Sequence, residues 1–174
     1  MGTSPHLPGV PCSFARDAPD RQEPPDTAMK RAQALRQLSR DHHKALVVAQ
    51  RLCRAEEPDR EARAIEFLDF WREHGHRHFQ VEEEVLLPAY ERVASAEEEP
   101  VVRVLTDHLT IRRRAADIEA GERTVGFLQE LGTILEGHVR HEERVLFPLI
   151  EQALPPSELD TLARAIARAE GEGP

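Results

Sequence analysis

Two stretches of this 174-residue chain place a histidine and a glutamate one helical turn apart. HFQVEEEVLLP pairs His78 with Glu82, and HVRHEERVLFP pairs His138 with Glu142. Residues four apart on an α-helix differ by about 40° around the axis and about 6 Å along it, so both side chains can reach one point. Imidazole and carboxylate groups that converge are typical ligands of iron, manganese or zinc. The spacing therefore indicates metal chemistry.

Both pairs lie in the apolar stripe of their helix, where an unpaired charge is costly. A buried carboxylate without a partner is destabilising, and two facing carboxylates also repel each other. A cation between them removes both penalties. The helix before each pair adds one histidine, His42 or His108, from an Asp-His dipeptide. By this symmetry we expect two metal ions with these ligands: His42, His78 and Glu82 for the first, and His108, His138 and Glu142 for the second. The two glutamates are the natural bridges, since each has two oxygens.

Other histidines near the pairs leave alternatives open. His74 lies one turn before His78, and three roles are open to it: an additional metal ligand, a proton-carrying group, or a pocket histidine that binds nothing. His43 competes with His42, although His42 lies on the more apolar face and matches His108. For the set as a unit, the alternative is ordinary core or half-exposed histidines that hydrogen-bond to their neighbours.

The residues beside the pairs are expected to point away from the centre. With a rotation of about 100° per residue, Glu83 and Glu143 fall on the solvated face of their helices. His76 and His141 also fall off the apolar stripe, so we expect them to be exposed. Trp71 is expected in the core, where it would help to keep water from the metals.

Four long segments of helical period position these residues. We expect helices at about 28–54, 60–87, 100–120 and 124–147, and a short last helix from about 155. Pro88 and Pro148 are expected to end the second and fourth helices, and Gly121 the third. At an offset of 60 residues the second segment is repeated in the fourth. A duplicated helical hairpin predicts an all-α, up-down-up-down four-helix bundle with approximate twofold symmetry.

Composition separates a tail from the bundle and argues against several functions. The net charge of -9 argues against binding to nucleic acid, and no run approaches the roughly 18 apolar residues of a membrane span. Two cysteines, Cys12 and Cys53, make no disulfide framework, which favours a reducing cytoplasmic setting. Residues 1–27 are rich in proline and are expected to be a disordered tail, with the bundle at 28–172. Met29 is an alternative start.

The motifs DHH, HFQVEEEVLLP, DHLTIR and HVRHEERVLFP resemble the hemerythrin-like HHE domain, across about residues 30–168. The resemblance implies a non-haem di-iron centre on the six residues named above, with two iron ions as the cofactor and manganese or zinc less favoured. Oxygen-carrying hemerythrins have a further histidine one turn after the position of His108, where this chain has Arg112. Four histidines with two glutamates are more similar to the iron-repair and iron-sensing branches.

The function implied by this resemblance is binding or sensing of oxygen or a related small ligand, such as nitric oxide or peroxide. The first alternative is a redox enzyme that reduces peroxide or nitric oxide or repairs iron centres, so the sequence leaves open whether the protein is an enzyme. The second is an iron-binding or iron-sensing module, in which metal loading orders the bundle for a partner. A redox partner protein is expected in the catalytic case, and the oligomeric state is left open.

Overall fold

The computed structural model describes residues 31–171, and all regular elements in this part of the chain are helical. The all-α prediction is therefore confirmed. The tail predicted at 1–27 and the alternative start at Met29 lie outside the described residues.

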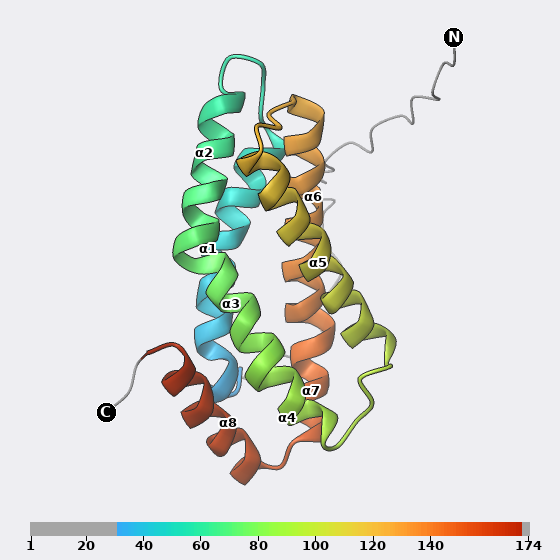
Figure 1. The fold of residues 1–174 in the computed structure, drawn as a ribbon. Coiled ribbons are helices and arrows are strands. Elements are labelled where there is room, and N and C mark those ends of the chain that lie inside the picture. The colour runs from blue at the N-terminus through green and yellow to red at the C-terminus, as the bar shows by residue number, and fades with distance from the viewer. Residues whose placement is uncertain (1–30, 172–174) are drawn as a thin grey trace, which may run out of the picture. The chain divides into compact units, whose positions relative to one another are not determined.

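Four long helical runs form an up-down-up-down bundle, and a fifth helix packs at one end (Figure 1). The runs are built from these elements: η1 (Gln33–Leu35) and α1 (Arg36–Cys53); α2 (Arg60–Phe70), η2 (Trp71–Gly75), α3 (His76–Val81), η3 (Glu82–Leu86) and α4 (Leu87–Glu91); α5 (Glu99–Glu119); α6 (Val125–His141), η4 (Glu142–Leu146) and α7 (Phe147–Ala153). The fifth helix is α8 (Pro156–Ala169). The predicted bundle is confirmed.

Pro88 and Pro148 do not end their helices, so this prediction is wrong. Each proline follows a wide π-helical turn, η3 or η4, and helix continues beyond it in α4 or α7. In these turns the backbone N–H of Leu87 donates to the carbonyl of Glu82, and the N–H of Phe147 donates to the carbonyl of Glu142, each five residues earlier. A proline lacks the N–H and crowds the carbonyl four residues back, and the wider turn relieves this conflict. The third helix does end as predicted, at Gly121 with φ 109°.

The core has two apolar layers with a polar layer between them. Along α1, Leu38 belongs to one layer and Ala45 to the other, with buried His42 between them. Along α5, His108 separates Val104 from Ile111 in the same way. The polar residues are therefore enclosed along the bundle axis by packed hydrocarbon on both sides.

The helices α1 and α6 approach each other closely at Gly132. A Cβ atom at this position would lie 2.7 Å from both the Ala49 carbonyl oxygen and the Cys53 backbone nitrogen. Only glycine fits this contact without movement of a helix backbone. The contact fixes the distance between two of the helices that carry the polar layer.

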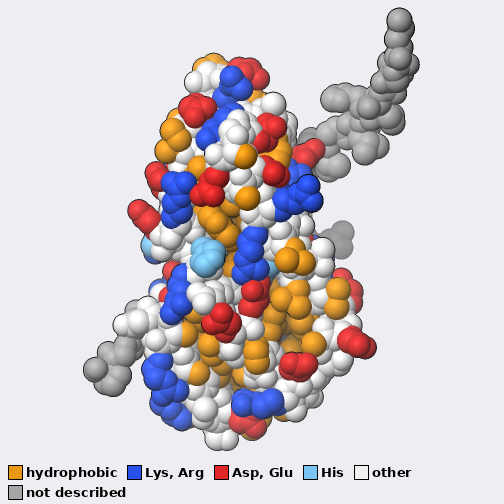
Figure 2. Space-filling view, viewed as in Figure 1, with side chains coloured by type: hydrophobic (Ala, Val, Ile, Leu, Met, Phe, Trp, Pro, Cys, Tyr) orange, Lys and Arg blue, Asp and Glu red, His pale blue; other side chains and the backbone are white. Residues whose placement is uncertain are grey.

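Charged side chains of both signs are interspersed over the face drawn in Figure 2. Some of them form exposed ion pairs, such as Arg72–Glu119 at 2.9 Å. Such pairs contribute about 0–1 kcal/mol each, so the stability of the bundle depends mainly on its core. Within residues 31–171, no helix combines the length and the apolar character that a membrane crossing requires.

Candidate metal centre

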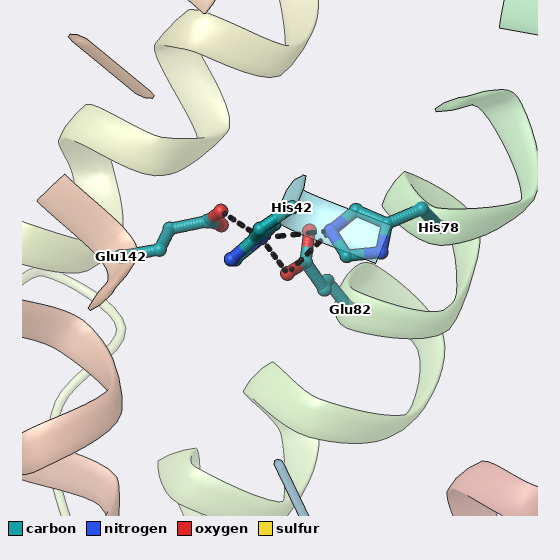
Figure 3. Close-up of side chains that lie close together, drawn as sticks. All are labelled: His42, His78, Glu82 and Glu142. Atoms are coloured by element: carbon teal, nitrogen blue, oxygen red, sulfur yellow. Dashed lines mark hydrogen bonds and ion pairs between the residues drawn. The ribbon is translucent and has the colours of Figure 1, made fainter. Parts of the chain in front are cut away.

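The structure brings all six predicted ligands together in the polar layer. Four helical runs supply them, and each is 7% exposed or less. They form two overlapping groups, within each of which one potential ligand atom per residue lies within 4.8 Å of the others. The groups are His42, His78, Glu82 and Glu142, drawn in Figure 3, and Glu82, His108, His138 and Glu142. Both glutamates belong to both groups, which is the arrangement expected of a binuclear site.

The inward nitrogens of the four histidines meet the two carboxylates. Glu82 faces both groups, because its Oε1 lies 3.2 Å from His78 Nε2 and its Oε2 lies 3.3 Å from His108 Nε2. Glu142 Oε2 lies 3.0 Å from His42 Nε2 and 3.2 Å from His138 Nε2. Every histidine of the set thus presents Nε2 toward a carboxylate shared by the two groups.

Several of these buried atoms lack a hydrogen-bond partner within the described chain. They include both carboxylate oxygens of Glu82 and of Glu142, and Nε2 of His108 and of His138. Buried polar atoms are nearly always satisfied by protein, water or an ion. Imidazole nitrogen and carboxylate oxygen are suitable donors for a transition-metal cation. The donor set therefore fits two cations between the glutamates.

The pKa values show how protons are shared in the metal-free protein. Burial alone would lower the pKa of His42, but the Glu142 carboxylate close to Nε2 and the hydrogen bond to Glu143 outweigh it and raise the pKa to about 10. Burial likewise opposes the raised pKa of His108, which reaches about 9 because of the nearby Glu82 carboxylate and the hydrogen bond to Glu83. A metal ion must displace these protons to bind.

The two glutamates differ in their electrostatic surroundings. Burial would raise the pKa of Glu82, but the charge of His78 and the close approach of the His108 and His78 rings hold it well below its usual range. Burial and the charge of Glu82 raise the pKa of Glu142. The second carboxylate is therefore harder to ionise until positive charge is placed between the pair.

Carboxylates also lie near Nδ1 of each of the four histidines, the ring nitrogen that points away from Glu82 and Glu142. His42 Nδ1 donates to Glu143 at 2.7 Å, and His108 Nδ1 donates to Glu83 at 2.7 Å. The prediction that Glu83 and Glu143 face solvent is wrong, since their side chains are only 27% exposed and bind histidine. Both residues lie in a π-helical turn, where the rotation per residue is smaller than in an α-helix, so each stays near the buried side. The sequence did contain one indication of a shared role, because Glu83 and Glu143 occupy the same position in the two copies of the 60-residue repeat.

The Asp-His dipeptides supply the other two outward carboxylates. Asp41 Oδ2 lies 4.0 Å from His78 Nδ1, and Asp107 Oδ2 lies 3.9 Å from His138 Nδ1. In each dipeptide the histidine therefore belongs to the centre, while the aspartate lies near Nδ1 of a histidine on a different helix. The repeated dipeptide marked these positions in the sequence, although it did not reveal their contact.

The remaining histidines lie outside both groups. His141 is 7% exposed, and its Nε2 lies 3.2 Å from the Pro100 carbonyl oxygen, so the prediction that it is exposed is wrong. The start of α5 covers it, a contact that local periodicity cannot reveal. His43 and His76 are exposed. The His74 side chain is 37% exposed and belongs to neither group.

A narrow pocket adjoins the first group. It is lined by polar residues (Asp41, His42, His74, His78 and His138) and by aromatic and aliphatic ones (Ala45, Phe70, Trp71, Phe79, Ile111, Leu135 and Val139, with Gly75). The space open to the centre of a water molecule is about 10 Å³, which is about the room that one small molecule needs. Trp71 is 8% exposed and lies in the core as predicted, beside this pocket.

Comparison with known protein families identifies the family of this chain. The model of the hemerythrin HHE cation binding domain matches residues 33–150. The matched span contains all six residues of the two groups and both outward glutamates. Comparisons with curated proteins and with solved structures find no match.

Proposed function

The chain belongs to the family of hemerythrin HHE cation-binding domains, and from this premise we propose that it is a non-haem di-iron protein. We further propose that it binds oxygen or a related small ligand, such as nitric oxide or peroxide, for ligand binding or sensing. The observation that carries the proposal is the pair of buried His/Glu groups that share Glu82 and Glu142. Iron is proposed because nitrogen and carboxylate ligands suit it and the family implies it.

The residues of the centre would hold one ion in each group. His42 and His78 would bind the first ion and His108 and His138 the second, while the glutamates span both. Bound ferrous ions would supply electrons to a small oxidant. The two apolar layers keep bulk water from the ligands, and the pocket beside His78 and His138 gives a small molecule its approach.

The small size and the mostly apolar wall of the pocket support the proposal that the ligand is a small molecule. Apart from the histidines and Asp41, its wall is aromatic or aliphatic, so a bulky or highly charged ligand would lose hydration without new partners. A diatomic molecule or peroxide is compatible with the limited room.

One observation favours the alternative of redox catalysis. His74 lines the pocket and is partly open to solvent, a position suited to the transfer of protons from solvent to a ligand in the pocket. Reduction of peroxide consumes protons, whereas reversible binding of oxygen without turnover needs no such supply. An iron-binding or iron-sensing module is the further alternative.

The test is to purify the untagged protein with ferrous iron, count metals per chain, and record visible spectra without oxygen and after air. Two irons with an oxygen-dependent charge-transfer band that anaerobic conditions reverse would support ligand binding. Two irons with irreversible oxidation would favour catalysis or sensing. A chain that binds neither iron, manganese nor zinc would contradict the proposal.

A further inference from the structure

Two outward glutamates are each bound to both a histidine and an arginine. Glu83 Oε1 accepts from His108 Nδ1 and from Arg112 Nη1, both at 2.7 Å, while its Oε2 accepts from Arg112 Nη2 at 2.8 Å. Glu143 Oε1 accepts from His42 Nδ1 at 2.7 Å, and its Oε2 accepts from Arg31 Nη2 at 2.7 Å. Neither carboxylate is free to turn away without breaking bonds on both sides.

A phenylalanine completes each arrangement. Phe79 stacks on the His108 ring, with centroids 3.7 Å apart and planes at 15°, and the Arg112 guanidinium carbon lies 5.7 Å from the Phe79 centroid. On the other side, Phe147 stacks on the His42 ring at 5.3 Å and 15°. We call each set of arginine, glutamate and phenylalanine an outer clamp: Arg112, Glu83 and Phe79 around His108, and Arg31, Glu143 and Phe147 around His42. In the second clamp the arginine also lies over the phenylalanine, at 5.3 Å.

The two clamps are not simple copies of each other. At the 60-residue offset Glu83 matches Glu143, but Phe79 matches Val139 and Phe147 matches Leu87. The arginines also come from different places, since Arg112 belongs to α5 and Arg31 precedes the first helix. The glutamates are thus related by the repeat, but the arginine and phenylalanine contacts are made from unrelated positions, which points to a requirement of the centre rather than to the repeat alone.

The clamps hold one histidine in each metal group tightly and leave the other looser. His78 and His138 have carboxylates 4.0 and 3.9 Å from Nδ1, and these Nδ1 atoms make no hydrogen bond within the described chain. Both looser histidines line the pocket, whereas His108 does not. Each group therefore combines a fixed histidine with one that can adjust.

We propose that Glu83 and Glu143 are positioning residues of the metal centre, each fixing one histidine with Nδ1 as donor and Nε2 toward the cation. This inference rests on the proposed metal-binding function. A carboxylate that accepts Nδ1–H selects the tautomer whose lone pair is on Nε2, and it raises the basicity of that nitrogen. The arginines hold the glutamates in place for this task.

The proposal predicts effects that are specific to one side of the centre. Glu83→Ala should weaken the ion held by His108 about 10- to 100-fold, the usual effect of losing such an outer partner. Glu143→Ala should do the same to the ion held by His42. Glu83→Gln should weaken binding less than Glu83→Ala, because the amide oxygen still accepts the hydrogen bond but carries no charge.

The experiment titrates metal-free protein with zinc(II) against a chromophoric chelator and records long-range ¹H–¹⁵N spectra of the imidazole rings. Glu84→Ala is the control, since Glu84 is adjacent to Glu83 but exposed and bonded to Gln80. The expected result is two zinc ions in wild type and Glu84→Ala, with one weakened step in Glu83→Ala. In the zinc-loaded form of that variant the His108 ring, but not the His42 ring, should no longer bind zinc through Nε2 alone.

The possible failures are distinguishable. If wild type binds two zinc ions and Glu83→Ala matches Glu84→Ala in both steps, the positioning role is overturned. If wild type binds no metal, the proposed function fails instead. Should Glu83→Ala not fold, Glu83→Gln keeps the shape of the side chain and decides the question. An unchanged affinity in both zinc-binding steps would overturn the proposal, and one weakened step would support it.

Discussion

Among the individual residues, Glu82 and Glu142 are the two that the proposed metal ions would share. Each contributes to both four-residue groups, so losing one removes a ligand from each ion at once. We therefore expect Glu82→Ala or Glu142→Ala to bind fewer than two irons per chain, rather than two irons with slightly lower affinity. Metal analysis after desalting measures this directly.

Glu84→Ala serves as the control for that loss, because it removes an exposed carboxylate from the same helical run. It should retain two irons and the wild-type spectrum. Retention of two irons in either Glu82→Ala or Glu142→Ala would disprove the bridging role assigned to that glutamate.

The raised pKa values of His42 and His108 predict that metal binding releases protons. With pKa values of about 10 and about 9, both rings are protonated at pH 7 in the metal-free protein, whereas a ligating imidazole must be neutral. Metal binding at pH 7 should therefore release about two protons, and the apparent affinity should rise with pH until each group has lost its proton. Above about pH 10 the proton release from these rings should disappear.

Calorimetry of zinc binding in two buffers with different ionisation enthalpies counts the released protons. Equal heats in both buffers at pH 7 would contradict the prediction. Glu143→Gln offers a matched comparison, because its neutral amide takes away the charged acceptor that raises the His42 pKa, which should reduce the proton count.

Among the helices, the apolar stripes and the repeat were enough to predict the four long runs and the residues of the polar layer. Leu38, His42, Ala45, Ala49 and Leu52 lie along one stripe of α1, and all five are buried. The wide turns η3 and η4 could not be predicted in this way. A proline in a helical pattern normally marks an end, and whether the chain widens a turn instead depends on the packing of α4 and α7 against the rest of the bundle.

The outer clamps were missed for the same reason. A rotation of 100° per residue directs Glu83 away from the centre, but the wide turn changes this rotation at the residues concerned. Arg31 binds Glu143, which lies 112 residues later in the sequence, and no local sequence pattern predicts such a contact. Local pattern therefore identified the residues closest to the centre, while their supports depend on tertiary packing.

Substitution of Gly132 or Gly137 by alanine is expected to change the stability of the bundle in opposite directions, although both residues lie in the same helix. Both lie in α6, but a Cβ at Gly132 would meet the backbone of α1 at 2.7 Å, whereas one at Gly137 meets nothing within 4 Å. Gly132→Ala should lower the free energy of unfolding by about 1–3 kcal/mol through overpacking. Gly137→Ala should raise it by about 0.4–1 kcal/mol, because alanine loses less backbone entropy on folding.

Denaturant unfolding of both variants, monitored by circular dichroism, compares the two effects. If Gly132→Ala is as stable as Gly137→Ala, the close approach of α1 and α6 is not required. A loss of metal binding in Gly132→Ala alone would show that this contact also sets the spacing of the polar layer.

The bundle as a unit carries a layer of polar residues where an ordinary bundle would carry hydrocarbon. Without a cation, the buried carboxylates repel each other and several of their oxygens lack partners. Burial of such groups reduces stability, and the two apolar layers must offset that cost. The proposed function and stability therefore conflict at the centre of the molecule, and a bound cation would resolve the conflict.

This conflict predicts that metal removal lowers the stability of the complete domain. At a free concentration 100 times the Kd, one ion that binds only the folded state contributes about 2.7 kcal/mol, so two ions contribute about 5 kcal/mol. For a chain of this size, roughly 2–4 °C of melting temperature corresponds to each kcal/mol, which gives a rise of about 10–20 °C on loading with zinc. Thermal unfolding with zinc and with a chelator measures this rise, and Glu82→Ala should show less than half of it. A wild-type protein that binds two zinc ions yet melts at the same temperature without them would mean that the unfolded chain binds zinc as tightly as the folded one, so that the folded polar layer gives no advantage in metal binding.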